Sequence, residues 1–150
     1  MSLKDGGVVH AGLIARRLGG YWRGVLIEGP SGSGKSDLAL RALSEGFRLV
    51  ADDRVVLWRS GGRLYGRAPD PLQGALEVRG LDVVATPAVP LAQIVLVARS
   101  GAPERIPEAQ SVEMLGIAVP LIELDLRDRS APAKLSRALD LFDGAANRRI

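Results

Sequence analysis

The run GPSGSGKS constrains the fold of this chain more than any other feature of its sequence. It satisfies the pattern Gly-x4-Gly-Lys-Ser/Thr of a phosphate-binding loop, which requires a buried strand before it and a helix after it. The apolar run 24–28 predicts that strand, and Leu40 and Leu43 at helical spacing predict that helix. This context favours a phosphate-binding loop over a chance Gly-Ser turn. The loop residues are Gly29, Pro30, Ser31, Gly32, Ser33, Gly34, Lys35 and Ser36.

The residue types in this loop suit a nucleoside triphosphate. Glycines let successive backbone N–H groups turn toward phosphate oxygens, and the following helix presents its positive N-terminal dipole. Lys35 can neutralise the β- and γ-phosphate oxygens, and the Ser36 hydroxyl can ligate a magnesium ion. ATP with Mg²⁺ is therefore the expected ligand pair.

Two acidic residues follow the next predicted strand. The run 47–51 leads to Asp52 and Asp53, at the edge of the sheet where an α/β fold binds its ligands. In phosphate-loop enzymes an acid at this place completes the magnesium shell or accepts a proton from the attacking hydroxyl. Adjacent side chains at a strand end point to opposite sides, so the two acids can have different roles. The alternative interpretation is a surface Asp-Asp turn.

His10 is the only histidine in the chain. A lone histidine near the N-terminus is more often a surface residue than a functional one. Its apolar neighbours, 8–9 and 11–14, can form a strand next to the phosphate loop. In that position a nearby carboxylate would bring the ring into a proton relay.

The remaining segments predict one mixed α/β domain over residues 1–150. Short extended segments separated by Gly and Pro favour hairpins, and longer apolar runs favour buried strands. The hairpin segments are 55–58, 63–67 and 76–78, the buried strands are 93–98 and 119–126, and a final helix is expected over 131–142. We expect a phosphate-loop nucleotide-binding domain with a mixed β-sheet, the loop's helix and a C-terminal helix, frayed at 1–6 and 144–150.

Composition argues against several classes of function. The net charge is +3, but the basic residues are scattered and aromatics are only 4%, so neither a duplex-binding stripe nor a base-stacking platform is expected. Zero cysteines exclude disulfides and thiolate metal sites. No apolar run reaches the roughly 18 residues of a membrane span, and no secretory leader is visible. We therefore expect a cytoplasmic protein with no nucleic-acid or membrane partner.

Four short segments occur in a specific order. They are 9–11, VHA; the loop 29–36 followed by Asp37; 47–53, FRLVADD; and 76–81, LEVRGL. The last two are distinctive, because phosphate-loop proteins in general do not share Leu-Val-Ala-Asp-Asp followed by Glu-x-Arg-Gly. The arrangement resembles the catalytic domain of HPr kinase/phosphorylase, the bacterial enzyme that phosphorylates a serine of the phosphocarrier HPr.

The resemblance implies a role for each matching residue. His10 and Asp52 would form the family's proton relay, with Asp52 as the base that activates the acceptor serine. Asp53 and Glu77 would lie near the magnesium ion with Ser36. Arg79 would position the loops around the phosphates. The implied partner is HPr or an HPr-like phosphocarrier, the implied process is regulation of the sugar phosphotransferase system and carbon metabolism, and the implied assembly is a homo-oligomer, a hexamer in the family.

The sequence also departs from the family. Family members carry a separate N-terminal domain, so this chain resembles the short proteobacterial form. The family stretch Pro-Val-Arg-Pro-Gly-Arg-Asn corresponds here to 124–130, which keeps two arginines. The segment after Gly80, a mobile loop in the family that helps to hold HPr and supports dephosphorylation, is shortened here to 82–90. The sequence thus supports kinase activity better than reverse phosphorylase activity.

Two other functions remain open from the sequence. A small-molecule kinase would need an arginine-rich lid, for which the segment 99–105 is a candidate. A non-catalytic ATP-binding sensor would need only the loop. The presence of His10, Lys35, Asp52 and Asp53 together argues against the sensor, because a sensor needs no base beside the phosphate.

Overall fold

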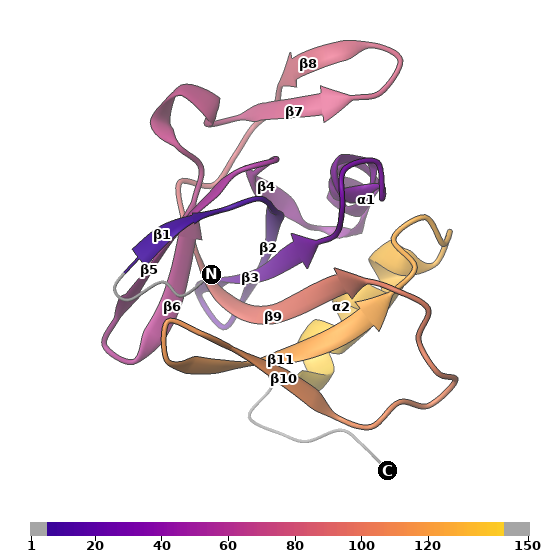
Figure 1. The fold of residues 1–150 in the computed structure, drawn as a ribbon. Coiled ribbons are helices and arrows are strands. Elements are labelled where there is room, and N and C mark those ends of the chain that lie inside the picture. The colour runs from indigo at the N-terminus through magenta and orange to yellow at the C-terminus, as the bar shows by residue number, and fades with distance from the viewer. Residues whose placement is uncertain (1–5, 143–150) are drawn as a thin grey trace.

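The computed structural model describes residues 6–142, and within this range the chain forms strands and two α-helices around a curled mixed sheet (Figure 1). The strands are β1 (Gly6–Val9), β2 (Gly12–Leu18), β3 (Tyr21–Glu28), β4 (Arg48–Ala51), β5 (Val55–Ser60), β6 (Arg63–Arg67), β7 (Ala75–Val78), β8 (Asp82–Ala85), β9 (Ala92–Ser100), β10 (Gln110–Met114) and β11 (Ile117–Leu124). The helices are α1 (Lys35–Ala42) and α2 (Ala131–Phe142), and short 3-10 turns lie at Leu43–Glu45 and Asp70–Leu72. The predicted α/β class is confirmed.

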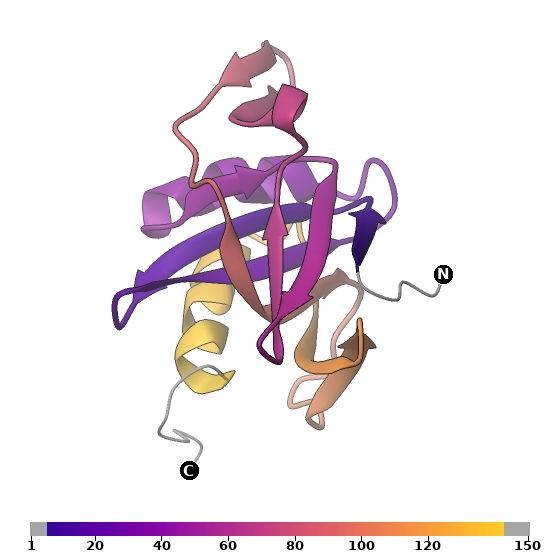
Figure 2. The ribbon, with the colours of Figure 1, turned by 90° about the vertical axis from the view of Figure 1, so that its left-hand side faces the viewer.

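The main sheet has the order β1-β5-β6-β9-β3-β2-β4 and branches at β9. One edge of β9 pairs in parallel with β3. The other edge pairs first with β6, antiparallel, and then with β11, parallel, and β11 carries β10. Strands β7 and β8 form a separate hairpin that projects from the body of the domain (Figure 2).

The predicted strand–loop–helix–strand unit is present, with one strand inserted into it. β2 lies between β3 and β4 and is antiparallel to both, so β3 and β4 run in the same direction without touching. The chain therefore leaves β3 and β4 at the same edge of the sheet and enters β2 at that edge. This edge carries the functional residues described below.

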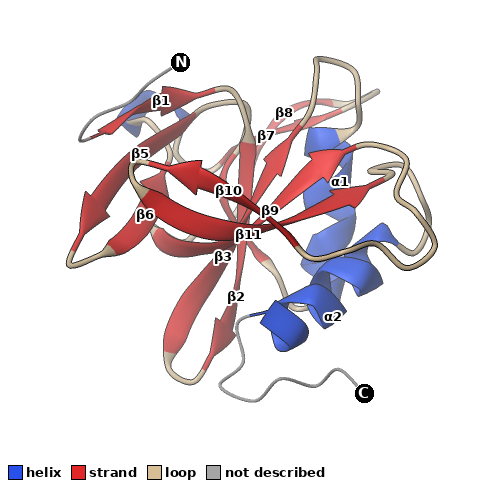
Figure 3. Cartoon of the chain, turned by 60° about the horizontal axis from the view of Figure 1, so that its bottom comes forward, coloured by secondary structure: helices blue, strands red, loops and turns tan. Residues whose placement is uncertain are grey.

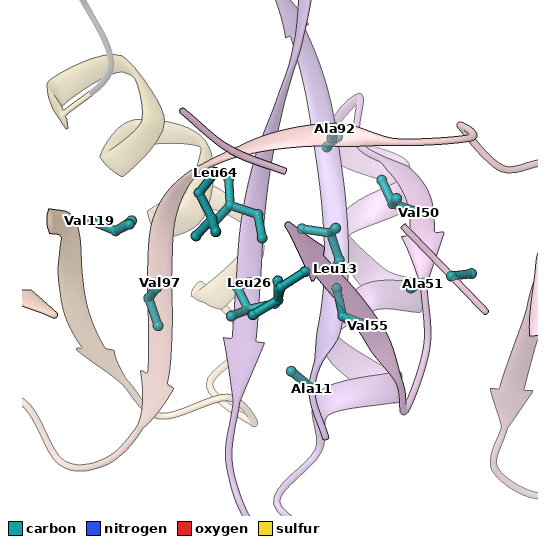
Figure 4. Packing of buried hydrophobic residues seen from close by; sticks show 14 of the residues in the cluster. Ala11, Leu13, Leu26, Val50, Ala51, Val55, Leu64, Ala92, Val97 and Val119 are labelled. Atoms are coloured by element: carbon teal, nitrogen blue, oxygen red, sulfur yellow. The ribbon is translucent and has the colours of Figure 1, made fainter. Parts of the chain in front are cut away.

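The central strands bury both of their faces, which divides the core into two clusters. Leu13 and Leu26 belong to the cluster beneath the curled strands β5 and β6 (Figure 4). Ile14 and Ile27, their neighbours in sequence, point to the opposite face and pack under α1 and α2. Both helices lie on this same side of the sheet (Figure 3). The alternation follows the two-residue period of a strand, and burial on both faces explains why these runs are continuously apolar.

Two strands were not predicted from the sequence, β8 and β10. β8 has only four residues, Asp-Val-Val-Ala, within the segment that the resemblance implied to be a mobile loop. β10 is mostly polar and lies at an edge of the sheet, so it carries only a weak strand pattern. β10 joins β11 through Leu115 and Gly116, both with positive φ, as a tight two-residue hairpin requires. Gly6 belongs to β1 rather than to a frayed end, and the other residues expected to fray lie outside the described range. No helix within residues 6–142 is long and apolar enough to span a membrane.

Arg16 on β2 fastens α2 to the sheet. Its guanidinium donates hydrogen bonds to the hydroxyl of Ser136 and, at 2.6 Å, to the carboxylate of Asp140. The same group lies over the ring of Phe47, 5.8 Å from its centroid. The long side chain thus joins a strand, a helix and a core aromatic residue at one point.

We predict that Arg16→Ala lowers the free energy of unfolding by about 2 kcal/mol, because it removes packing and leaves two polar partners without their donor. The ion pair itself contributes little of this, since Asp140 is about two-fifths exposed. Urea denaturation measures the change. Arg17→Ala, at the exposed next position of β2, should change stability by less than about 0.5 kcal/mol. Equal losses in the two variants would contradict the anchoring role.

Candidate active site

The predicted phosphate loop lies between β3 and α1, as its pattern requires. Gly34 caps α1 with a φ of 102°, which a residue with a side chain rarely adopts. A Cβ on Gly29 would lie 2.5 Å from the Ser33 hydroxyl, so this position also excludes larger residues. Lys35 is 8% exposed, and its ammonium donates to the carbonyls of Gly29, at 2.6 Å, and Pro30, at 3.1 Å. These contacts hold the ammonium inside the curve of the loop.

Asp52 lies beneath the loop and uses both carboxylate oxygens. The Ser36 hydroxyl donates to one oxygen at 2.8 Å, and the backbone N–H of Glu77 donates to the other at 3.0 Å. Asp52 is 8% exposed. The pairing of Asp52 with His10 that the resemblance implied is therefore wrong in this structure, because both oxygens face other partners.

Asp53 is the partner of His10. The Nε2 atom of the ring lies 2.5 Å from a carboxylate oxygen of Asp53, and both side chains are partly exposed. The backbone of Asp53 is left-handed, with a φ of 68°, and its carbonyl accepts the N–H of Ala11 at 3.2 Å. A non-glycine residue held at positive φ often marks a functional site, and Asp is among the residues that tolerate it.

The sheet topology explains why these residues meet. The phosphate loop follows the end of β3, and the two acids follow the end of β4. His10 lies two residues before β2, which runs the opposite way between them. The three segments therefore reach the same edge. Strand direction brings the histidine to the edge where an acid 43 positions away lies, and the left-handed turn at Asp53 completes the approach.

These residues line a pocket of about 360 Å³. Glu77 and Arg79 reach it from the β7–β8 hairpin, and Asp37 reaches it from the first turn of α1. The lining residues are His10, Ser31, Gly32, Gly34, Lys35, Ser36, Asp37, Asp53, Glu77 and Arg79. The pocket thus gathers most residues of the predicted site. The predicted residues that do not line it are Gly29, Pro30, Ser33 and Asp52, of which Asp52 is hydrogen-bonded to the lining residue Ser36.

Arg127 is a contributor that the sequence did not single out. It lies in the loop between β11 and α2, and its guanidinium donates to the carbonyls of Gly32 and Ser33. The same loop is held by Arg41 of α1, which donates to the carbonyl of Leu126. Arg127 therefore supports the phosphate loop from outside. No local sequence pattern connects the two, because the contact spans 95 positions.

Comparisons with known proteins agree with this geometry. The family model described as the HPr Serine kinase C-terminal domain matches residues 9–89, which is more than half of the chain. The chain belongs to this family. A solved structure, the Hpr(Ser) kinase/phosphatase from Coxiella burnetii, superposes with a TM-score of 0.74 over 89% of this chain and 93% of that chain, at 25% sequence identity. The resemblance seen in the sequence is therefore confirmed.

Curated relatives match a shorter part. The HPr kinase/phosphorylase of Clostridium tetani is 46% identical over 69 residues, which is 46% of this chain and 23% of that protein. The HPr kinase/phosphorylase of Brevibacillus brevis is 49% identical over 65 residues, or 43% of this chain and 21% of that protein. The matched part is less than a quarter of either relative.

We predict that Arg127→Ala loosens the phosphate loop. Without its two hydrogen bonds, exchange of the Ser33 amide, which is bonded to the Pro30 carbonyl at 3.1 Å, should become about tenfold faster, or about 1.4 kcal/mol in local opening. Hydrogen exchange resolved by mass spectrometry or NMR measures this. Arg129→Ala, from the same loop and also exposed, is the matched control and should leave the rate unchanged. An unchanged exchange rate of the Ser33 amide in Arg127→Ala would show that the hydrogen bonds from Arg127 do not stabilise the loop.

Proposed function

We propose that this domain transfers the γ-phosphoryl group of ATP, with Mg²⁺, to a serine of HPr or an HPr-like phosphocarrier, and so regulates the sugar phosphotransferase system. One observation carries the proposal. The lysine and hydroxyl of a phosphate-binding loop open onto the same pocket as the His10–Asp53 pair. A cradle for phosphate and a base within one pocket are what phosphoryl transfer to a hydroxyl needs.

The geometry supports Asp53, rather than Asp52, as the base. Asp53 is exposed to the pocket and hydrogen-bonded to His10, whereas Asp52 is buried with both oxygens occupied. The serine oxygen would attack the γ-phosphorus, the bond from phosphorus to the β,γ-bridging oxygen would break, and ADP would leave. Asp53 would accept the serine proton while His10 orients the carboxylate. In the phosphorylase direction, an oxygen of inorganic phosphate would attack the phosphorus of phosphoserine and the bond from phosphorus to the serine oxygen would break. Protonated Asp53 would return its proton to that oxygen, and pyrophosphate would leave.

The site fits a magnesium ion held partly by substrate. Mg²⁺ is usually bound by one or two protein groups, with phosphates and water completing its shell. Within residues 6–142, no three His, Asp or Glu side chains are arranged to hold a metal by themselves. Ser36 and Glu77 line the pocket beside the loop and would contact the ion, with Asp53, the third ligand implied by the resemblance, assigned here to the proton. The ion would neutralise charge on the phosphates.

The pocket gives less support to the other two functions. The segment 99–105, the candidate lid of a small-molecule kinase, contributes no residue to the pocket, and Arg99 is paired with Glu28 at 3.0 Å. A sensor has no use for a strained Asp53 held against His10. The open pocket instead suits an acceptor serine on a folded protein. A hexameric assembly, a cytoplasmic location and a single domain over 1–150 remain part of this proposal.

We predict that Lys35→Ala weakens ATP binding at least 100-fold, because it removes the positive charge inside the loop. Isothermal titration calorimetry with Mg²⁺ and ATP measures the affinity. Lys134→Ala, which removes a lysine that pairs with Asp128 on the surface, should bind ATP normally. Micromolar affinity retained in Lys35→Ala would exclude the loop as the nucleotide site.

We predict that Asp53→Asn keeps ATP affinity within about threefold while lowering phosphoryl transfer to HPr by roughly 100-fold to 10,000-fold. Asparagine tolerates positive φ, so the backbone should be preserved. Mass spectrometry of HPr after incubation with Mg²⁺ and ATP gives the rate of serine phosphorylation. Asp70→Asn, at an exposed acid of a 3-10 turn, should transfer normally. Full activity in Asp53→Asn would assign the base elsewhere.

A further inference from the structure

The β7–β8 hairpin stands apart from the main sheet yet carries two residues of the pocket, Glu77 and Arg79. An isolated two-stranded hairpin is marginally stable, so its position depends on the contacts at its base. Leu76 provides one of these contacts, since it is fully buried in the cluster beneath α1. The outer strand β8 is exposed along its whole length, and the exposed side chains of Leu81 and Val83 form the apolar tip of the hairpin.

The polar contact at the base of the hairpin is made by Asp52. Its carboxylate accepts the Glu77 N–H with one oxygen and the Ser36 hydroxyl with the other. One buried side chain thus joins the phosphate loop to the backbone of β7, across 16 positions on one side and 25 on the other. Because the Ser36 proton is donated to Asp52, the lone pairs of the hydroxyl oxygen remain available to a cation in the pocket.

We propose that Asp52 is a positioning residue that couples occupancy of the phosphate loop to the placement of the β7–β8 hairpin. A cation on the Ser36 oxygen would polarise its O–H bond and strengthen the hydrogen bond to Asp52. The stronger bond from Ser36 fixes the orientation of the planar Asp52 carboxylate, so its other oxygen presents a fixed acceptor to the Glu77 N–H. Loading with Mg²⁺ and ATP therefore draws Glu77, Arg79 and the apolar tip into one arrangement. This inference rests on the proposed binding of nucleotide, but not on the identity of the acceptor.

Such coupling gives the reaction an order. The hairpin, with its apolar tip beside the pocket, is fixed only after nucleotide is bound, so a protein acceptor that touches it binds the loaded domain more tightly than the empty one. Linkage requires the converse to hold as well, with the acceptor increasing nucleotide affinity by the same factor. Asp52 acts through backbone and hydroxyl partners and needs no contact with the reacting atoms.

Hydrogen exchange of the whole chain, read separately for segments 29–36 and 75–85, tests the coupling. In the wild type, Mg²⁺ with ATP should slow exchange in both segments, by about tenfold in the hairpin, while ATP with EDTA should protect mainly the loop. In Asp52→Asn one of the two accepting oxygens becomes an NH2 group, which donates and cannot accept, so the two bonds cannot both be kept. The variant should keep protection of the loop and lose that of the hairpin. Asp82→Asn is the control, because Asp82 lies on the hairpin and bonds only to the adjacent Val83 N–H among the described contacts.

A second pair of variants changes the Ser36 end of the Ser36–Asp52 hydrogen bond and leaves the buried carboxylate unaltered. Ser36→Ala removes the donor and should uncouple the hairpin, whereas Ser36→Thr keeps a hydroxyl and should restore the coupling. Hairpin protection that persists in Asp52→Asn and in Ser36→Ala would overturn the proposal, as would a protected loop with an unaffected hairpin in the wild type. Protection of neither segment would overturn the nucleotide-binding proposal itself and this inference with it.

Discussion

Strand β2 runs antiparallel between β3 and β4 and hydrogen-bonds to both of them. The arrangement of the pocket depends on this insertion. Two parallel strands deliver the phosphate loop and the acid pair to one edge, and the reversed strand between them starts at that edge with His10 just before it. A plain crossover unit would have placed the same loop and acids together but would have left no neighbouring position for the histidine.

Local patterns allowed much of this site to be predicted, because a phosphate loop is a contiguous structure whose glycines, lysine and hydroxyl act within one turn of chain. The partner of His10 was assigned wrongly for a physical reason. Alternation along a strand predicts that Asp52 and Asp53 face opposite sides. It does not predict which side each side chain takes, because both residues lie beyond the end of β4. The positive φ of Asp53 changes the direction of the chain at this point. Arg127 escaped prediction because its contact is wholly tertiary.

The family model and the solved structure match different lengths of this chain. The family model ends at residue 89, and every predicted site residue lies before that point. The later strands β9 and β11 and helix α2 contribute mainly buried surface, through residues such as Leu96, Leu124 and Leu135. Such a core is specified by the pattern of apolar residues and by their total side-chain volume more than by which apolar residue stands at each position. This explains how the fold extends over 89% of the chain at 25% identity to its solved relative.

The parallel pairing of β3 with β9 also affects how the domain folds during its synthesis. The last residue before the phosphate loop, Glu28, lies beside Arg99, 71 positions later. Contacts of such large sequence separation close long loops of chain before they contribute stability, so folding should be slow for a domain of this size. During synthesis the loop emerges early but lacks its neighbouring strand until most of the domain has been translated. The nucleotide site is therefore expected to be among the last parts to reach its final geometry on the ribosome.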